Sequence, residues 1–185
     1  ESGRVKIRAE LGVSDERILL LSVGELNENK NHEAVIRAIS GMKNITYVIV
    51  GNGELRDKLE TTSAECGVDC RLVGFRTDVA DFYDAADVYI LPSIREGLNV
   101  SLMEAMASGL PCLVGKIRGN VDLVDESGGY LFNPSSVEEI RSAVQKAVNM
   151  TTEERQEQGN HNLKTIRLFD LQTVENVASE IYRGV

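Results

Sequence analysis

The stretch that decides the fold runs from residue 88 to residue 111 and reads VYILPSIREGLNVSLMEAMASGLP. Its first four residues, Val88–Leu91, are apolar and end at a proline, which is typical of a short buried strand. A loop containing Glu96 and Gly97 follows, and Val100–Ala107 then shows the spacing of a helix with one apolar face. The stretch therefore predicts a strand, a loop and a helix in succession, which is the repeating unit of an α/β fold.

The same alternation continues along most of the chain. Apolar runs typical of strands covered on both faces occur at Ile18–Val23, Thr46–Val50, Arg71–Val73, Val88–Leu91, Pro111–Val114 and Gly129–Phe132. Helical patterns lie between and after them, at His32–Ser40, Glu54–Cys66, Val79–Ala85, Val100–Ala107 and Val137–Val148. We therefore predict one α/β domain over residues 1–185, a Rossmann-like, doubly wound parallel sheet of about six strands with helices on both faces.

The chain becomes helical after its last predicted strand. Ser135 or Ser136 is expected to cap the helix that begins at Val137, and Thr151 or Thr152 the next one. Residues 164–185 form the last segment, with an amphipathic helix expected over Leu171–Tyr182.

In a doubly wound sheet the ligand crevice lies beyond the carboxyl ends of the strands. Glu96 and Glu104, separated by seven residues, frame this part of the fourth strand–helix unit, and Gly97 between them permits close approach of the backbone to a ligand. The helix that follows presents unpaired N–H groups and the positive end of its dipole. Amides that bind an anion, with a carboxylate on each side, suit a phosphorylated polyol such as a sugar nucleotide.

A simpler role exists for part of this motif. Ser101 and Glu104 have the spacing of a capping box, in which each side chain accepts a hydrogen bond from the helix N-terminus. A cap alone does not explain Glu96 and Gly97 before it, nor the small-residue helix after it.

The whole stretch from Ser93 to Pro111 resembles the donor-binding signature of retaining, GT-B-fold glycosyltransferases of family 4, the glycosyl transferases group 1. The resemblance implies that Glu96 is catalytic and faces the transferred sugar, and that Glu104 binds the ribose hydroxyls. It implies that Gly97 and the amides of Leu98 and Asn99 hold the donor diphosphate.

The loop after the first strand carries the second match to this family. Gly24 ends that strand, and Lys30 stands where the family has a lysine that binds the diphosphate. Glu25 occupies the position where the family has an arginine, which is a departure from the pattern. Lys30 is alternatively a solvated residue at the start of a helix, although the helix dipole disfavours a cation there. Glu25 is expected to point away from the diphosphate or to pair with Lys30.

The remaining donor-binding candidates follow other strands of the predicted sheet. Gly51 and Gly53 are expected to line the nucleoside pocket, or alternatively to form only a tight turn. Phe75 packs either on the base or in the core, and Arg76 is a donor ligand or a solvated residue. Arg118 is a candidate replacement for the cation that is absent at position 25, or an exposed surface residue.

Composition excludes several classes of function. The net charge of −9 argues against nucleic acid or anionic lipid as a general partner, and no apolar run reaches the ~20 residues that span a bilayer. The three cysteines, Cys66, Cys70 and Cys112, show no disulfide or zinc pattern, and Cys112 lies in an apolar run typical of the core. His32 and His161 are expected at the surface. No metal site is predicted, and a reducing cytoplasm fits best.

The resemblance implies an enzyme that moves a hexosyl or N-acetylhexosaminyl group from a nucleoside diphosphate sugar, UDP first, to an acceptor hydroxyl in bacterial surface-polysaccharide synthesis. The chain would be the C-terminal, donor-binding half of the GT-B fold. An acceptor-binding domain would precede it and bring it to the inner membrane, the isolated half would be inactive, and neither metal nor other cofactor would be needed. One alternative is a sugar-nucleotide-binding or regulatory module without turnover, which Glu25 leaves open. Another is a GT-B-fold epimerase or phosphorylase, which the match from Glu96 to Glu104 disfavours.

Overall fold

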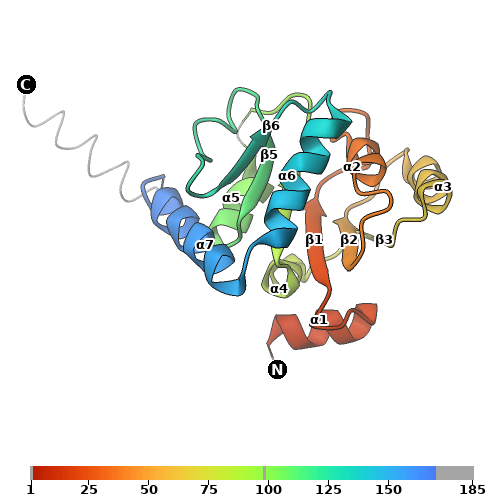
Figure 1. Ribbon diagram of the computed structural model, residues 1–185, viewed down its shortest axis with the longest axis horizontal. Coiled ribbons are helices and arrows are strands. Elements are labelled where there is room, and N and C mark those ends of the chain that lie inside the picture. Colours follow the sequence, from red (N-terminus) through yellow and green to blue (C-terminus); the bar gives the residue numbers. More distant parts are fainter. Residues whose placement is uncertain (1, 98, 170–185) are drawn as a thin grey trace, which may run out of the picture.

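The computed structural model describes residues 2–97 and 99–169, and these form a three-layer α/β domain (Figure 1). The elements in chain order are α1 (Gly3–Leu11), β1 (Ile18–Val23), α2 (His32–Ala38), β2 (Ile45–Val50), α3 (Arg56–Cys66), β3 (Cys70–Gly74), α4 (Val79–Ala85), β4 (Val88–Leu91), α5 (Val100–Ala107), β5 (Cys112–Gly115), β6 (Gly129–Phe132), α6 (Val137–Asn149) and α7 (Thr152–Arg167). The predicted fold class is confirmed, and all six predicted strands are present with bounds that agree within one residue.

The six strands form one sheet in the order β3-β2-β1-β4-β5-β6, and every neighbouring pair is parallel. The chain runs outward from β1 to β3 on one side, then returns to place β4 beside β1 and continues outward on the other side. The boundary between β1 and β4 is therefore the topological switch point, where the loops after two adjacent strands turn to opposite faces and leave a crevice.

Helices cover both faces of the sheet (Figure 1). Side chains of α1, α4 and α5 form one apolar core with one face of the strands, with Phe82, Leu102 and Met106 among its buried members. Side chains of α2, α3 and α6 form the other core, which includes Ile36, Leu59 and Ile140. The strands are buried almost throughout because both faces are covered, which explains why they appear in the sequence as unbroken apolar runs.

The ends of the chain differ most from the sequence prediction. The sequence did not predict α1, which is held by the buried guanidinium of Arg8 through hydrogen bonds to the carbonyl of Ala85 and the carboxylate of Asp87. Ser136 and Thr151 are the caps of α6 and α7, as predicted, and Thr151 forms a capping box with Glu154. The helix predicted over Leu171–Tyr182 lies outside the described residues.

Candidate functional site

The loops after β1 and β4 meet at the switch point of the sheet and bring Lys30 to Glu96. The Lys30 Nζ donates to Glu96 Oε1 at 2.7 Å, and the two side chains are only 18% and 11% exposed. Among the described residues Glu96 is the only side chain that accepts from this ammonium group, which has three N–H donors in all. Lys30 is therefore a largely buried cation that pairs with one carboxylate, and its remaining N–H donors at the carboxyl edge of the sheet are suited to bind an anion.

Asparagine side chains fix the two loops to each other. The Asn29 side chain accepts from the Arg95 backbone N–H through Oδ1 at 3.1 Å and donates from Nδ2 to the Arg95 carbonyl at 2.9 Å. The backbone carbonyl of Asn29 also accepts from the Ile94 N–H at 2.9 Å. Asn31 adopts a left-handed φ of 54° and donates to the carbonyls of Pro92 and Pro134. The position of Lys30 relative to Glu96 is therefore set by the backbone on both sides and not by the ion pair alone.

Glu25 does not share in this ion pair. Its carboxylate is exposed and accepts from the Asn27 side chain at 2.9 Å, while Lys30 pairs with Glu96 instead. The expected alternative in which Glu25 pairs with Lys30 is therefore wrong, because that lysine pairs with Glu96.

Glu104 lies on the exposed side of α5, with its carboxylate held by a tyrosine of α4. The Tyr83 hydroxyl donates to Glu104 Oε2 at 2.9 Å and lies 3.1 Å from the Ser101 carbonyl oxygen. Burial, helped by Tyr89 and Glu104, raises the pKa of Tyr83, so its hydroxyl stays a donor. Glu104 Oε1 accepts no hydrogen bond within the described part of the chain, and a cavity of about 260 Å³ adjoins both side chains.

The capping-box alternative for Glu104 is wrong. The N-cap of α5 is Asn99, whose Oδ1 accepts from the Leu102 N–H at 3.1 Å and from the Ser101 hydroxyl at 2.8 Å. Glu104 contacts Tyr83 rather than the helix N-terminus, so its carboxylate has no capping role. Leu98, the other residue expected to offer an amide to the diphosphate, lies outside the described residues.

The glycines predicted to line the donor site bring backbone segments into close contact. A Cβ added at Gly51 would lie 2.0 Å from the Gly24 carbonyl oxygen, and one at Gly53 would lie 2.3 Å from that of Leu26. These two glycines allow the loop after β2 to pack directly on the loop after β1. At Gly97, in contrast, an added Cβ would meet no atom of the described residues within 4 Å, so packing does not require glycine there.

Phe75 and Arg76, after β3, have different surroundings. The Phe75 side chain is 75% exposed at the carboxyl edge of the sheet, so it is not a core residue. The guanidinium of Arg76 is already engaged, with hydrogen bonds to Glu10 at 2.7 Å and to Asp78 at 2.8 Å. Its charge is therefore largely neutralised by two carboxylates, whereas the phenyl ring of Phe75 is free to pack on a ligand.

The loop after β5 borders the motif on its other side. A Cβ added at Gly119, which has a φ of 92°, would lie 2.5 Å from the Gly97 carbonyl oxygen, so this loop packs against the backbone of the motif. Arg118, next to it, is exposed, and no carboxylate pairs with it among residues 2–97 and 99–169. An unpaired arginine in this place is consistent with the cation proposed to compensate for Glu25.

His32 is the residue whose environment the sequence prediction placed wrongly. It is 2% exposed, at the start of α2, and its Nδ1 lies 3.0 Å from the Tyr47 hydroxyl. Burial lowers the pKa of His32 to about 4, and Lys30 acts in the same direction, while the Glu25 carbonyl opposes them. His161, in contrast, is half-exposed and pairs with Asp125, as expected for a surface residue.

Comparison with known proteins identifies the family. The model of the glycosyl transferases group 1 family matches residues 3–165. The chain belongs to this family. It is 33% identical over 144 residues, 72% of the chain, to the UDP-Gal:alpha-D-GlcNAc-diphosphoundecaprenol alpha-1,3-galactosyltransferase of Escherichia coli. It is also 30% identical over 154 residues to an uncharacterized glycosyltransferase of Methanocaldococcus jannaschii.

A solved glycosyltransferase structure shares the fold. The chain superposes on HepE of Anabaena in complex with UDP and glucose with a TM-score of 0.85 and 21% identity, covering 99% of this chain and 52% of HepE. The chain covers 37% and 40% of the two sequence relatives, so it spans less than half of their length. The predicted family and the prediction of half a GT-B fold are thus confirmed.

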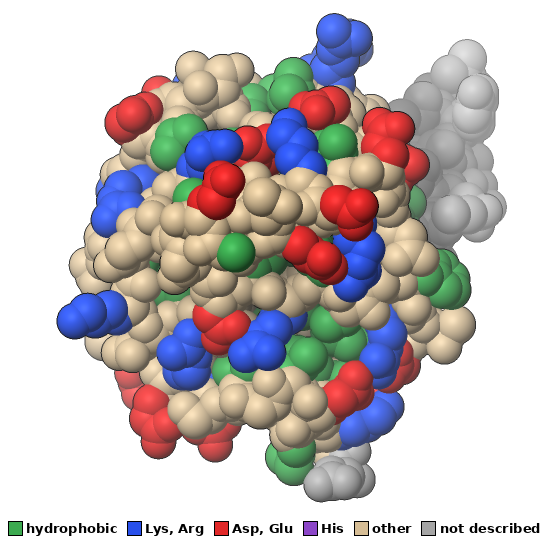
Figure 2. Space-filling view, turned by 90° about the vertical axis from the view of Figure 1, so that its right-hand side faces the viewer, with side chains coloured by type: hydrophobic (Ala, Val, Ile, Leu, Met, Phe, Trp, Pro, Cys, Tyr) green, Lys and Arg blue, Asp and Glu red, His purple; other side chains and the backbone are tan. Residues whose placement is uncertain are grey.

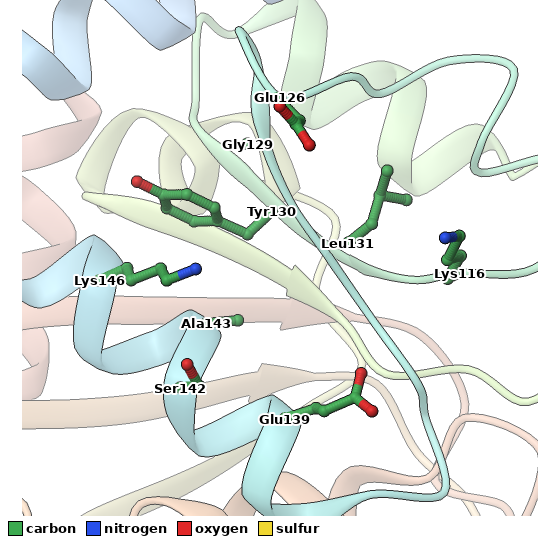
Figure 3. Close-up of a pocket in the computed structure, with 9 residues that line it drawn as sticks. All are labelled: Lys116, Glu126, Gly129, Tyr130, Leu131, Glu139, Ser142, Ala143 and Lys146. Atoms are coloured by element: carbon green, nitrogen blue, oxygen red, sulfur yellow. The ribbon is translucent and has the colours of Figure 1, made fainter.

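Other features of this family member lie outside the donor motif. A cavity of about 550 Å³ lies between β6 and α6, where the Lys146 ammonium sits 5.3 Å from the centre of the Tyr130 ring (Figure 3). Positive and negative side chains are intermingled on the face shown in Figure 2, which has no single-sign patch. In the described part of the chain no helix is long and apolar enough to cross a membrane, and no three metal-ligating side chains cluster.

Proposed function

We propose that the chain is the donor-binding part of a retaining transferase that moves a hexosyl or N-acetylhexosaminyl group from a UDP-sugar to an acceptor hydroxyl. The observation that carries this proposal is the Lys30–Glu96 ion pair at the switch point of the sheet, 2.7 Å long and bordered by the N-terminus of α5. Family membership supports the reaction class, and the UDP bound to HepE supports the choice of base.

In this proposal Lys30 provides the positive charge for the donor diphosphate. The ammonium keeps unused N–H donors beside Glu96, and the first amides of α5 add the positive end of a helix dipole. These groups stabilise the charge that develops on the departing UDP, and their positions are fixed before the donor arrives. The diphosphate then needs no divalent cation.

The two glutamates bind different parts of the donor. Glu104 Oε1 and Oε2 accept from the vicinal ribose hydroxyls, with Tyr83 fixing the carboxylate from the other side. Glu96, anchored by Lys30, faces the transferred sugar, where a carboxylate bonds the hydroxyls and favours positive charge at the anomeric carbon. Phe75 packs on the base, Gly24, Gly51 and Gly53 shape the backbone beneath the nucleotide, and Arg118 and Arg76 are further candidate contacts.

Bacterial surface-polysaccharide synthesis is the proposed setting, with the enzyme in the cytoplasm or at the inner membrane. The Escherichia coli relative acts on a sugar attached to diphosphoundecaprenol, and an Erwinia amylovora relative, 35% identical over 127 residues, is an amylovoran biosynthesis glycosyltransferase. Acceptor binding is proposed to belong to a second domain, and residues 1–185 alone should therefore bind the donor nucleotide but not transfer sugar.

A nucleotide screen tests the proposed function. UDP, GDP, ADP and CMP are titrated calorimetrically into residues 1–185 and into the Lys30→Ala variant, with Lys43→Ala as the matched control. Lys43 is an exposed lysine in the loop that enters β2, at the opposite edge of the sheet. We expect UDP to bind most tightly and only Lys30→Ala to weaken it. No binding of any nucleoside diphosphate, or equal effects of the two variants, would refute the proposal.

A further inference from the structure

A chain of polar side chains is buried in the core beneath the phosphate side of the proposed site. Ser22 of β1, Tyr47 of β2 and His32 of α2 are 1%, 0% and 2% exposed. The Ser22 hydroxyl lies 2.6 Å from the Ile90 carbonyl and 2.9 Å from the Tyr47 hydroxyl, which in turn lies 3.0 Å from His32 Nδ1. Buried polar groups are destabilising unless they are paired, so their presence in an otherwise apolar core requires a reason.

Counting protons fixes the direction of every bond in this chain. The carbonyl of Ile90 can only accept, so the single hydroxyl proton of Ser22 is donated to it. Ser22 must then accept from Tyr47, and Tyr47, having donated its only proton, must accept from the Nδ1–H of His32. Neutral His32 therefore carries its proton on Nδ1. Its Nε2 is buried and has no hydrogen-bond partner among the described residues.

His32 is thus fully buried, with one ring nitrogen bonded to Tyr47 and with the Glu25 carbonyl acting on the ring to raise its pKa. What histidine adds is a directed bond that ties the first residue of α2 to the β2 strand, and through Ser22 to the Ile90 carbonyl of β4. The loop that carries Glu96 continues from β4, so the polar chain links the two sides of the ion pair.

Lys30 is followed in the chain by Asn31 and His32, whose side chains are both held by hydrogen bonds. The Asn31 side chain donates to the carbonyls of Pro92 and Pro134 in the neighbouring loops. The His32 ring bonds to the Tyr47 hydroxyl in the core and is the inward anchor of this segment. The backbone N–H of Lys30 is itself bonded to the Asn27 side chain at 3.0 Å. The segment from Lys30 to His32 therefore has little freedom, and its inward anchor is the histidine.

We propose that His32 is a positioning residue for Lys30, acting through the Tyr47–Ser22–Ile90 chain of hydrogen bonds. The inference rests on the proposed role of Lys30 in binding the donor diphosphate. If the inward anchor is lost, the start of α2 gains freedom and the Lys30 ammonium loses its fixed place between Glu96 and the diphosphate. Binding of the phosphates should then weaken, whereas binding of the nucleoside, which contacts other loops, should not.

The test compares UDP with uridine, which lacks the phosphates. In residues 1–185, Tyr47→Phe removes only the hydroxyl that accepts from His32. We expect the affinity for UDP, measured by ligand-observed NMR, to fall about 5- to 10-fold with unchanged affinity for uridine. Tyr130→Phe is the matched control and should change neither, because the one hydrogen bond of the Tyr130 hydroxyl within residues 2–97 and 99–169 is a 4.0 Å contact with Met150 Sδ. Ser22→Ala breaks the same chain with a smaller change and should act in the same direction.

A double variant separates positioning from a merely structural role. When Lys30 is already replaced by alanine, Tyr47→Phe should have no further effect on the affinity for UDP, because the group it positions is gone. An equal fall in both backgrounds, an equal fall for UDP and uridine, or a lowered Tm with unchanged affinity for UDP would overturn the inference. If Lys30→Ala itself leaves UDP binding unchanged, the phosphate role of Lys30 is wrong and the positioning role falls with it.

Discussion

The two sides of the proposed donor site are built differently. On the phosphate side, the loops after β1 and β4 are joined by the Lys30–Glu96 ion pair and by three hydrogen bonds of Asn29 to Ile94 and Arg95. On the base side, the loop after β3 leaves Phe75 75% exposed, and its cation, Arg76, is bound to Glu10 and Asp78.

The phosphate side is therefore already assembled before a ligand binds, whereas the base side is not. Charges that are fixed before a ligand arrives need no reorganisation when it binds, so the phosphate side should contribute most of the binding energy and of the catalytic effect. An exposed aromatic ring contributes by burial only when the ligand covers it. Substitutions on the phosphate side should therefore have large effects, and those on the base side small ones.

The largest effect is expected at Glu96 in a full-length enzyme that carries this domain. Glu96→Ala should lower kcat at least about 100-fold, the size typical of losing one electrostatic contact to a transition state. The affinity for UDP should stay within about threefold, because UDP lacks the sugar that Glu96 faces. Steady-state kinetics and UDP titration of the same variant measure both values. A variant with unimpaired turnover would remove Glu96 from the catalytic role.

The pH dependence of stability tests whether His32, the proposed anchor of the phosphate side, is buried in its neutral form. Burial holds the pKa of His32 at about 4 in the folded protein, against about 6.5 in the unfolded chain. The unfolded state therefore takes up the proton first, and stability falls as the pH falls from 6.5 towards 4. The loss is about 1.4 kcal/mol per pH unit, or about 3 kcal/mol over the window.

Denaturant unfolding between pH 4.5 and 7 checks this value against His32→Gln, which cannot take up the proton. The free energy of unfolding of the variant should depend less steeply on pH in that range. Equal slopes for the two proteins would mean that His32 titrates normally and that its buried, neutral state is incorrect.

Glu104→Gln should have the next largest effect, because it removes the charged acceptor from the ribose site. We expect the affinity for UDP to fall by about 1.5–3 kcal/mol, the typical loss for a charge-assisted hydrogen bond. The affinity for inorganic pyrophosphate should not change. Stability should change little, since Asn99 and not Glu104 caps α5. An unchanged affinity for UDP would show that the ribose is bound elsewhere.

The sequence predicts the fold well because its signals are local. The β4 and β6 strands have the predicted bounds, since a short apolar run that ends at a proline or a turn residue defines both ends of a strand. The sequence also supplied Lys30, Glu96 and Glu104, but only through their place in a family motif. That Lys30 pairs with Glu96, 66 residues away, depends on the strand order and is not visible in the sequence.

The errors have identifiable physical causes. His32 lies between polar neighbours, which favoured the surface, yet it shares the helical phase of Val35, Ile36 and Ile39, and that spacing could have placed it in the core. The sequence did not single out Tyr83, because its partner Glu104 lies on another helix. The α1 helix was missed because its buried face includes Arg8, which is stabilised by groups near residue 87.

The smallest effect is expected at Phe75, on the base side. Phe75→Ala should weaken UDP binding about two- to fivefold and leave the free energy of unfolding within about 0.5 kcal/mol, as for other exposed positions. Titration of UDP and of pyrophosphate distinguishes the two sides, because pyrophosphate binding should be unaffected. A loss as large as that at Glu104 would contradict the proposed difference between the two sides.

The measurement that tests the central claim most directly is calorimetric titration of UDP into residues 1–185, with Mg²⁺ and with the metal removed by EDTA. The claim is that Lys30 and the N-terminus of α5 hold the diphosphate without a metal ion. We predict the same dissociation constant under both conditions, and a loss of at least about tenfold in affinity for Lys30→Ala in each, as expected for a charge-assisted contact. Binding of UDP that appears only with Mg²⁺ would contradict it.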